Sequence, residues 1–139
     1  MLKMTRREAR EQALCLVFER LFQTEPLPEM IELAKEAREL DPDTFTEKLT
    51  AGVFEHIEEI DSRIEKYSIG WNKERLSRVV LSILRLCIYE ISFEENVPIS
   101  VSINEAVELA KKYAGEGDAA FVNGILGTIA RNDFGEVIV

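Results

Sequence analysis

The sequence predicts an all-α fold of two small packed helical bundles, with about three helices in the N-terminal half and three to four in the C-terminal half. Apolar residues recur with a helical period along almost the whole chain, and no stretch alternates apolar and polar residues as a half-buried strand does. Three segments have the capping-box spacing that starts helices. One segment, about residues 73–93, is apolar around most of its circumference and therefore belongs at the centre of a bundle.

The first predicted helix is capped by Thr5, because T-R-R-E places Glu8 at the position that a capping box requires. It ends before Pro26. Its apolar stripe contains Leu14, Val17, Phe18, Leu21 and Phe22. A second helix covers about residues 28–39 and ends before D-P-D.

The third predicted helix is capped by Asp41 or Thr44 and continues past Gly52. The segment YSIGWN then marks a seam, so we expect one domain over residues 1–139 with sub-bundles at about 1–68 and 71–139.

The second sub-bundle begins with the apolar central helix. After N-V-P, the capping box S-I-N-E predicts a helix capped by Ser102. G-E-G-D is a glycine turn, and one last helix follows it.

Composition indicates a globular protein, with 46% hydrophobic and 31% charged residues and a net charge of −9. No signal peptide is visible, and the longest apolar run is interrupted by Arg85, so we expect a cytoplasmic protein that does not enter a membrane. The acidic balance argues against broad nucleic-acid binding but allows a small basic site. Cys15 and Cys87 lie in apolar helical patterns and are predicted to be buried free thiols.

Catalysis finds no support in the sequence. There is no phosphate-binding glycine loop, and His56 is the only histidine, so neither a zinc-ligand set nor a nucleophile–base pair can be assembled. Paired carboxylates such as Glu58 and Glu59 lie on an acidic, solvated helix face. We therefore expect no enzyme, no metal and no cofactor.

The basic N-terminus is the most informative feature. Lys3, Arg6, Arg7 and Arg10 stand beside a single acid in an acidic chain. Cations in a first helical turn oppose the helix dipole, at a cost of about 0.3–1 kcal/mol each. At 100° per residue these four side chains share the arc of the apolar stripe, so the first turns are predicted to overhang the core and present arginines suited to phosphates. The alternative is that they pair with carboxylates of neighbouring helices.

Two further surfaces carry open alternatives. Arg78, Arg85 and Tyr89 form a polar strip on the central helix, which is either its solvent edge or a ridge for a partner protein. Phe121 follows the glycine turn and is either a core residue or a platform for an RNA base.

Three segments resemble the NusB family of bacterial antitermination factors. They are R-R-E-A-R-E-Q-A-L at the start, L-S-R-V-V-L-S-I-L-R-L-C-I-Y-E in the central helix, and V-P-I-S-V-S-I-N-E-A-V-E-L-A-K-K-Y followed by F-V-N-G-I-L. The resemblance covers essentially the whole chain. It implies two helical bundles, no enzymatic activity, and binding of boxA RNA together with NusE in the RNA polymerase antitermination complex, notably on ribosomal RNA operons.

The resemblance also implies roles for individual residues. Arg6, Arg7 and Arg10 would hold boxA phosphates and bases, with Lys3 adding charge, and Phe121 would be offered to a base beside Asn123. The partner-binding candidates, near the central helix, are Glu74, Arg78 and Tyr89. The chain departs from the family's usual E-[ND]-S-x-x-F pattern, because G-E-G-D-A-A-F is one residue shorter and Ala120 replaces a lysine.

Two other functions remain as alternatives at this stage. One is a protein–protein adaptor whose arginines dock an acidic partner. The other is a detached regulatory domain related to those of ribosomal RNA methyltransferases. The family includes monomers and dimers, so a homodimer is also open.

Overall fold

The computed structural model describes residues 5–23, 26–38, 44–68 and 76–136, and over these residues the chain forms seven α-helices and no strand. The helices are α1 (Arg6–Arg20), α2 (Leu27–Arg38), α3 (Thr44–Glu55), α4 (Ile57–Tyr67), α5 (Arg78–Phe93), α6 (Ile99–Tyr113) and α7 (Glu116–Phe134). None of the described helices is long and apolar enough to cross a membrane. The prediction of an all-α fold is confirmed.

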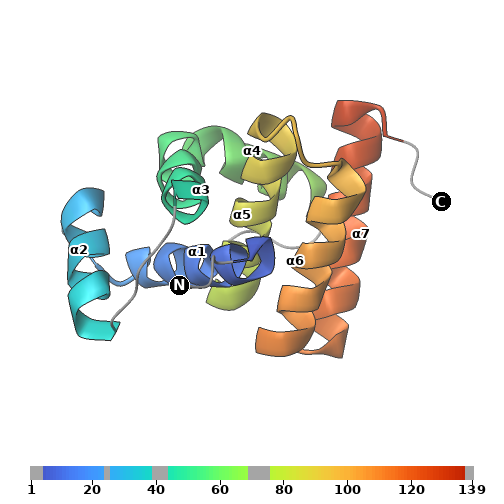
Figure 1. Cartoon of the computed structure of the whole chain (residues 1–139). Helices are drawn as coiled ribbons and strands as arrows, with labels where there is room; N and C mark the ends of the chain where they lie inside the picture. Colours follow the sequence, from blue (N-terminus) through green and yellow to red (C-terminus); the bar gives the residue numbers. More distant parts are fainter. Residues whose placement is uncertain (1–4, 24–25, 39–43, 69–75, 137–139) are drawn as a thin grey trace.

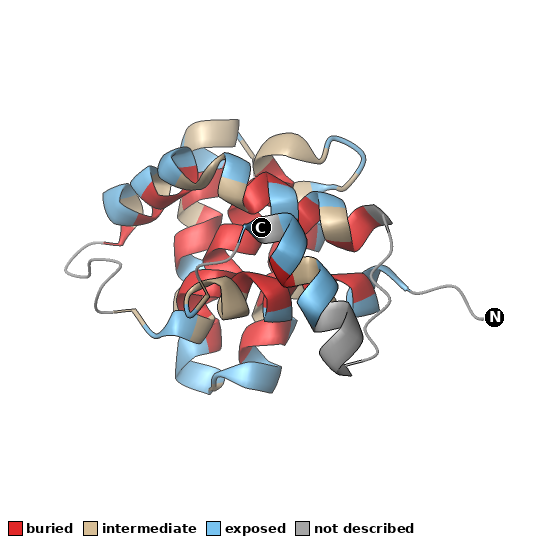
Figure 2. Cartoon of the chain, turned by 90° about the vertical axis from the view of Figure 1, so that its left-hand side faces the viewer, coloured by how far each residue is buried: buried red, intermediate tan, exposed pale blue. Residues whose placement is uncertain are grey.

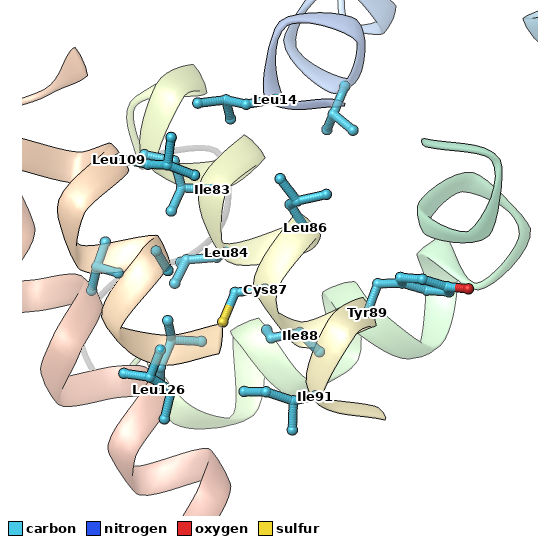
Figure 3. Packing of buried hydrophobic residues seen from close by; sticks show 14 of the residues in the cluster. Leu14, Ile83, Leu84, Leu86, Cys87, Ile88, Tyr89, Ile91, Leu109 and Leu126 are labelled. Carbon is cyan, nitrogen blue, oxygen red and sulfur yellow. The ribbon is translucent and has the colours of Figure 1, made fainter. Parts of the chain in front are cut away.

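Helix α5 is the centre of the molecule. It packs against α1, α3, α4, α6 and α7, and Figure 1 shows it surrounded by helices from both halves of the chain. Every residue from Val80 to Ile91 is buried. Figure 3 shows side chains of α5 meeting Leu14 of α1, Leu109 of α6 and Leu126 of α7. Burying this much apolar surface is the main force that assembles the bundle.

The two halves share one hydrophobic core. A single cluster of buried residues includes Leu49 and Ile60 from the first half and Ile103 and Ile129 from the second. Buried residues run through the interior in Figure 2, with exposed residues on the outer faces of the helices. Helix α2 lies at one edge (Figure 1), where buried Met30 packs against Leu16 in a small separate cluster.

The predicted N-cap at Thr5 is confirmed, because the Glu8 amide donates to Thr5 Oγ1 at 3.1 Å. The Glu8 carboxylate accepts from the Thr5 hydroxyl, also at 3.1 Å. The predicted cap at Ser102 is wrong. Helix α6 begins four residues earlier, with Pro98 and not Ser102 at the N-cap position. Ser102 is therefore inside the helix and buried. The central helix begins at Arg78, and residues 73–75 lie outside the described residues, as does Asp41.

The third predicted helix is two helices, because the chain leaves helical geometry at His56 (φ −113°, ψ 22°). At this break the His56 ring stacks on Phe93 of α5 with ring centroids 4.0 Å apart. The break between α3 and α4 therefore coincides with an aromatic contact to α5.

The cysteine prediction is half correct. Both cysteines are free thiols, but only Cys87 is buried, whereas Cys15 is exposed on α1. Burial raises the pKa of the Cys87 thiol well above its ordinary value, because the thiolate is disfavoured away from water. Phe22, predicted for the apolar stripe, is 55% exposed.

Candidate nucleic-acid interface

Arg6 and Arg7 are both exposed in the first turn of α1. Thr5 fixes the start of this helix through its side-chain oxygen, so the two arginines occupy a defined turn. Lys3 lies outside the described residues. The structure thus brings together two of the four predicted cations at an exposed helix end.

Arg6 lies on an aromatic ring. Its guanidinium carbon is 3.8 Å from the centre of the Phe45 ring, and Phe45, in the first turn of α3, is itself only 8% exposed. This is within the range of a cation–π contact. Phe45 is not predicted from the sequence, because nothing in the local pattern indicates which helix faces the start of α1.

Arg7 forms a two-pronged ion pair with Glu105 of α6. Its Nε donates to Oε2 at 3.1 Å and its Nη2 to Oε1 at 2.9 Å. These hydrogen bonds lower the pKa of Glu105 and raise the pKa of Arg7. Figure 1 shows the N-terminal end of α1 against α6. Arg7 is therefore held in place by Glu105. An RNA phosphate that binds Arg7 would have to compete with the Glu105 carboxylate.

Acidic side chains continue along the same groove between α1 and α6. A pocket of about 200 Å³ is lined by Arg7, Glu11, Glu105, Glu108, Leu109 and Lys112. Lys112 Nζ lies 2.8 Å from Glu11 Oε1, and this hydrogen bond raises the pKa of Lys112. The groove therefore alternates cations and anions, and its cations already have intramolecular partners.

Arg10 does not belong to the exposed site, and its predicted place on an overhang is wrong. It is 5% exposed, and its Nε lies 3.0 Å from both carboxylate oxygens of Glu90 on α5. A second bond joins Arg10 Nη2 to Glu90 Oε1, and Ser102 Oγ donates to the same oxygen at 3.0 Å. Burial disfavours the charged form, but the bonds to Glu90 outweigh it and raise the pKa of Arg10. Arg10 therefore follows the alternative stated above, in which the arginine pairs with a carboxylate of a neighbouring helix.

Phe121 and Asn123 lie in the second turn of α7, because the helix already begins at Glu116 inside the glycine turn. Phe121 is half-buried and packs against the main core, while Asn123 is exposed. Helices α6 and α7 pack side by side as a hairpin. Phe121 and Asn123 therefore lie on the helix next to α6, the helix whose Glu105 pairs with Arg7.

The candidates for partner binding that the structure describes, Arg78 and Tyr89, differ in their exposure to solvent. Glu74 lies outside the described residues. Arg78 is exposed at the start of α5, with its guanidinium carbon 4.7 Å from the centre of the Phe22 ring.

Tyr89 is 6% exposed, so its prediction as a docking residue is wrong. In Figure 3 its ring extends from α5 toward α3, where it occupies the space over Gly52. Burial raises the pKa of the Tyr89 phenol.

The rest of the polar strip on α5 is also buried. Arg85 is 8% exposed and forms two hydrogen bonds of 2.9 Å with Asp61 of α4. Arg85 and Tyr89 are therefore not on the solvent edge of α5, because α4 and α3 cover them, and Arg78 is the exposed residue of the strip. Within the described residues no group of three or more His, Cys, Asp and Glu side chains could hold a metal ion.

Comparisons with known proteins agree on one family. The model of the NusB family matches residues 7–131. The transcription antitermination protein NusB of Clostridium botulinum (strain Kyoto / Type A2) is 44% identical over 140 residues, covering 89% of this chain and 98% of that protein.

Two solved structures are similar over nearly the whole chain. NusB of T. maritima is 36% identical and superposes with a TM-score of 0.82, covering 94% of each chain. A chain in the crystal structure of antitermination factors NusB and NusE in complex with dsRNA is 31% identical, with a TM-score of 0.80, covering 91% of this chain and 96% of that one. The chain described here belongs to the NusB family.

Proposed function

We propose that this protein is a non-catalytic transcription antitermination factor that binds boxA RNA together with NusE and joins the RNA polymerase antitermination complex in the cytoplasm. The observation that carries the proposal is the pair of exposed arginines, Arg6 and Arg7, in the first turn of α1. They oppose the helix dipole, so the local stability of α1 does not explain why they stand there. Guanidinium forks suit phosphate oxygens.

The similarity to a protein crystallised with NusE and dsRNA supports the same ligand class for this chain. Asn123 is an exposed candidate contact on α7, and half-buried Phe121 can offer only part of its ring. Arg78 is the described candidate for the NusE surface. Because Glu105 already pairs with Arg7 and the chain is acidic, we expect weak RNA binding by this protein alone and tighter binding with NusE.

The test is a titration of fluorescently labelled boxA RNA and of a scrambled RNA, with and without NusE, followed by fluorescence anisotropy. We expect NusE to increase the preference for boxA. The variant Arg6→Glu/Arg7→Glu should bind boxA at least about tenfold more weakly, since it loses two charge-assisted contacts. The slope of log affinity against log salt should also flatten by about 0.7 for each lost phosphate contact on single-stranded RNA.

The matched control is Lys66→Glu/Arg131→Glu, which makes the same change in net charge at two exposed residues of α4 and α7. We expect it to bind boxA nearly as the parent does. Equal losses in the two variants would mean that net charge, and not the start of α1, governs binding. Equal binding of boxA and scrambled RNA in the presence of NusE would contradict the proposed specificity.

A further inference from the structure

Phe45 and Arg6 form a contact between two helices that are far apart in the sequence. The Arg6 guanidinium carbon lies 3.8 Å from the Phe45 ring centre. Arg6 is exposed, whereas Phe45 is 8% exposed. Unlike Arg7, Arg6 forms no ion pair with a carboxylate in the described part of the chain. The aromatic ring is therefore its main described contact.

The ring itself is firmly held. Phe45 belongs to the main hydrophobic cluster, and the next residue, Thr46, donates from Oγ1 to the carbonyl oxygen of Ala9 on α1 at 3.3 Å. The guanidinium carbon of Arg10 lies 5.7 Å from the centre of the same ring. Arg10 is in turn fixed by its bonds to Glu90. Phe45 is thus a fixed surface beneath a side chain that would otherwise be free in water.

We propose that Phe45 is a positioning residue for RNA binding, which holds the Arg6 guanidinium at the start of α1 so that it is ready to contact the RNA. The inference rests on the proposed function. A free arginine loses rotamer freedom when it binds, and a side chain that is already placed loses less. A planar guanidinium lying over a ring keeps its in-plane N–H donors available for a phosphate or a base edge, which a lysine cannot reproduce.

The test is a double-mutant cycle on boxA RNA in the presence of NusE, with the parent, Phe45→Leu, Arg6→Ala and the double variant. Phe45→Leu should weaken binding about three- to fivefold, the range expected for an exposed cation–π contact. In the Arg6→Ala background the same change should have no further effect. Phe45→Trp should restore the parent affinity if it folds as the parent does.

Phe134→Leu is the matched control. Phe134 is likewise a ring under an arginine, with the Arg63 guanidinium carbon 5.0 Å from its centre, but it is only partly buried and lies at the C-terminal end of α7. We expect it to lower stability without changing RNA affinity. If Phe45→Leu weakens binding equally with and without Arg6, the ring acts through packing alone and the inference is overturned.

A second measurement uses the unaltered protein and so does not depend on the folding of any variant. In NMR spectra, the Arg6 side-chain protons should show ring-current shifts and NOEs to the Phe45 ring, and both should persist when boxA RNA and NusE are added. Loss of the NOEs on RNA binding would overturn the inference. If RNA binds equally to the parent and to Arg6→Glu/Arg7→Glu while the NOEs are present, the proposed RNA site fails although the contact exists.

Discussion

Arg6 and Arg10 are one helical turn apart on α1 and have opposite surroundings. Both face the same side, as their positions on a helical wheel predict. However, Arg6 is at the exposed end of the helix, whereas α5 and α6 close over Arg10 and supply Glu90 and Ser102. A helical wheel gives the direction of a side chain but not the position at which the neighbouring helix ends. The end of the neighbouring helix decides whether an arginine is exposed to a ligand or buried in the core.

We predict that Arg10→Ala lowers the free energy of unfolding by about 3–5 kcal/mol, the usual effect of removing one partner of a buried ion pair. Glu90 is 2% exposed and would keep only its bond from Ser102. Urea unfolding followed by circular dichroism measures the change. Arg6→Ala is the control, and we expect it to change stability by no more than about 1 kcal/mol. A small effect of Arg10→Ala would mean that water or a neighbouring donor replaces Arg10 beside Glu90 at little cost.

Gly52 is needed because the Tyr89 ring packs against it, and not because its backbone has a positive φ. A Cβ atom at this position would lie 2.3 Å from two ring carbons of Tyr89. We predict that Gly52→Ala destabilises the protein by about 1–3 kcal/mol through overpacking, although alanine favours a helix. The control is Gly124→Ala in α7, where a Cβ meets nothing within 4 Å, and we expect it to stabilise by up to about 1 kcal/mol. Thermal unfolding of both variants measures the difference, and stabilisation by Gly52→Ala would contradict the prediction.

At the scale of elements, the sequence predicted where apolar faces lie better than where helices begin and end. The T-R-R-E signal at Thr5 was sufficient, because the cap is local. The S-I-N-E signal failed because Pro98 starts α6 earlier and Ser102 is used by the buried Glu90. Neither a glycine nor a proline stands at the helix break at His56. The break coincides with a ring stack on α5, a tertiary contact that no window of sequence contains.

The ion pair between Arg7 and Glu105 joins α1 to α6. Its contribution to the free energy of unfolding should therefore depend on pH. The hydrogen bonds from Arg7 hold the pKa of Glu105 below its ordinary value of 4.5. The unfolded chain therefore binds this proton more readily, so the stabilisation is present above about pH 4.5 and is lost as the pH falls through the lowered pKa. We predict that Glu105→Gln destabilises the protein at pH 7 and that the difference from the parent disappears at acidic pH.

Urea unfolding from pH 3 to pH 7 measures this difference. Glu108→Gln is the matched control, because Glu108 lies in the same groove but its ion pair, with Lys111 at 3.5 Å, stays within α6. We expect its effect to be small at every pH. A difference between Glu105→Gln and the parent that stays constant across the range would mean that the ionisation of Glu105 does not couple to folding.

At the scale of the whole molecule, the sequence predicted the exposed residues of the candidate site but not the residues that support them. Arg6 and Arg7 were predicted from charge, dipole and wheel position, Phe121 from its place after a glycine turn, and Asn123 from the family motif. Phe45, Glu105 and Glu90 were missed, because each acts across a helix interface. Glu90 carried a signal, since a carboxylate in a helix that is apolar around most of its circumference needs a buried partner. The partner itself is fixed only by the packing of α1 on α5.

The same packing determines how the molecule unfolds. Helix α5 contributes to one core cluster that contains residues of both halves of the chain, and the buried pairs Arg10–Glu90 and Arg85–Asp61 each join α5 to the N-terminal half. We therefore predict a single cooperative transition, with equal calorimetric and van't Hoff enthalpies of about 100 kcal/mol for a chain of this length. Scanning calorimetry measures the enthalpies, and hydrogen exchange should give the slowest amides of α3 and α6 the same opening free energy. Two separate transitions, or a markedly lower opening free energy in α3, would mean that the sub-bundles unfold independently and that the shared core does not couple them.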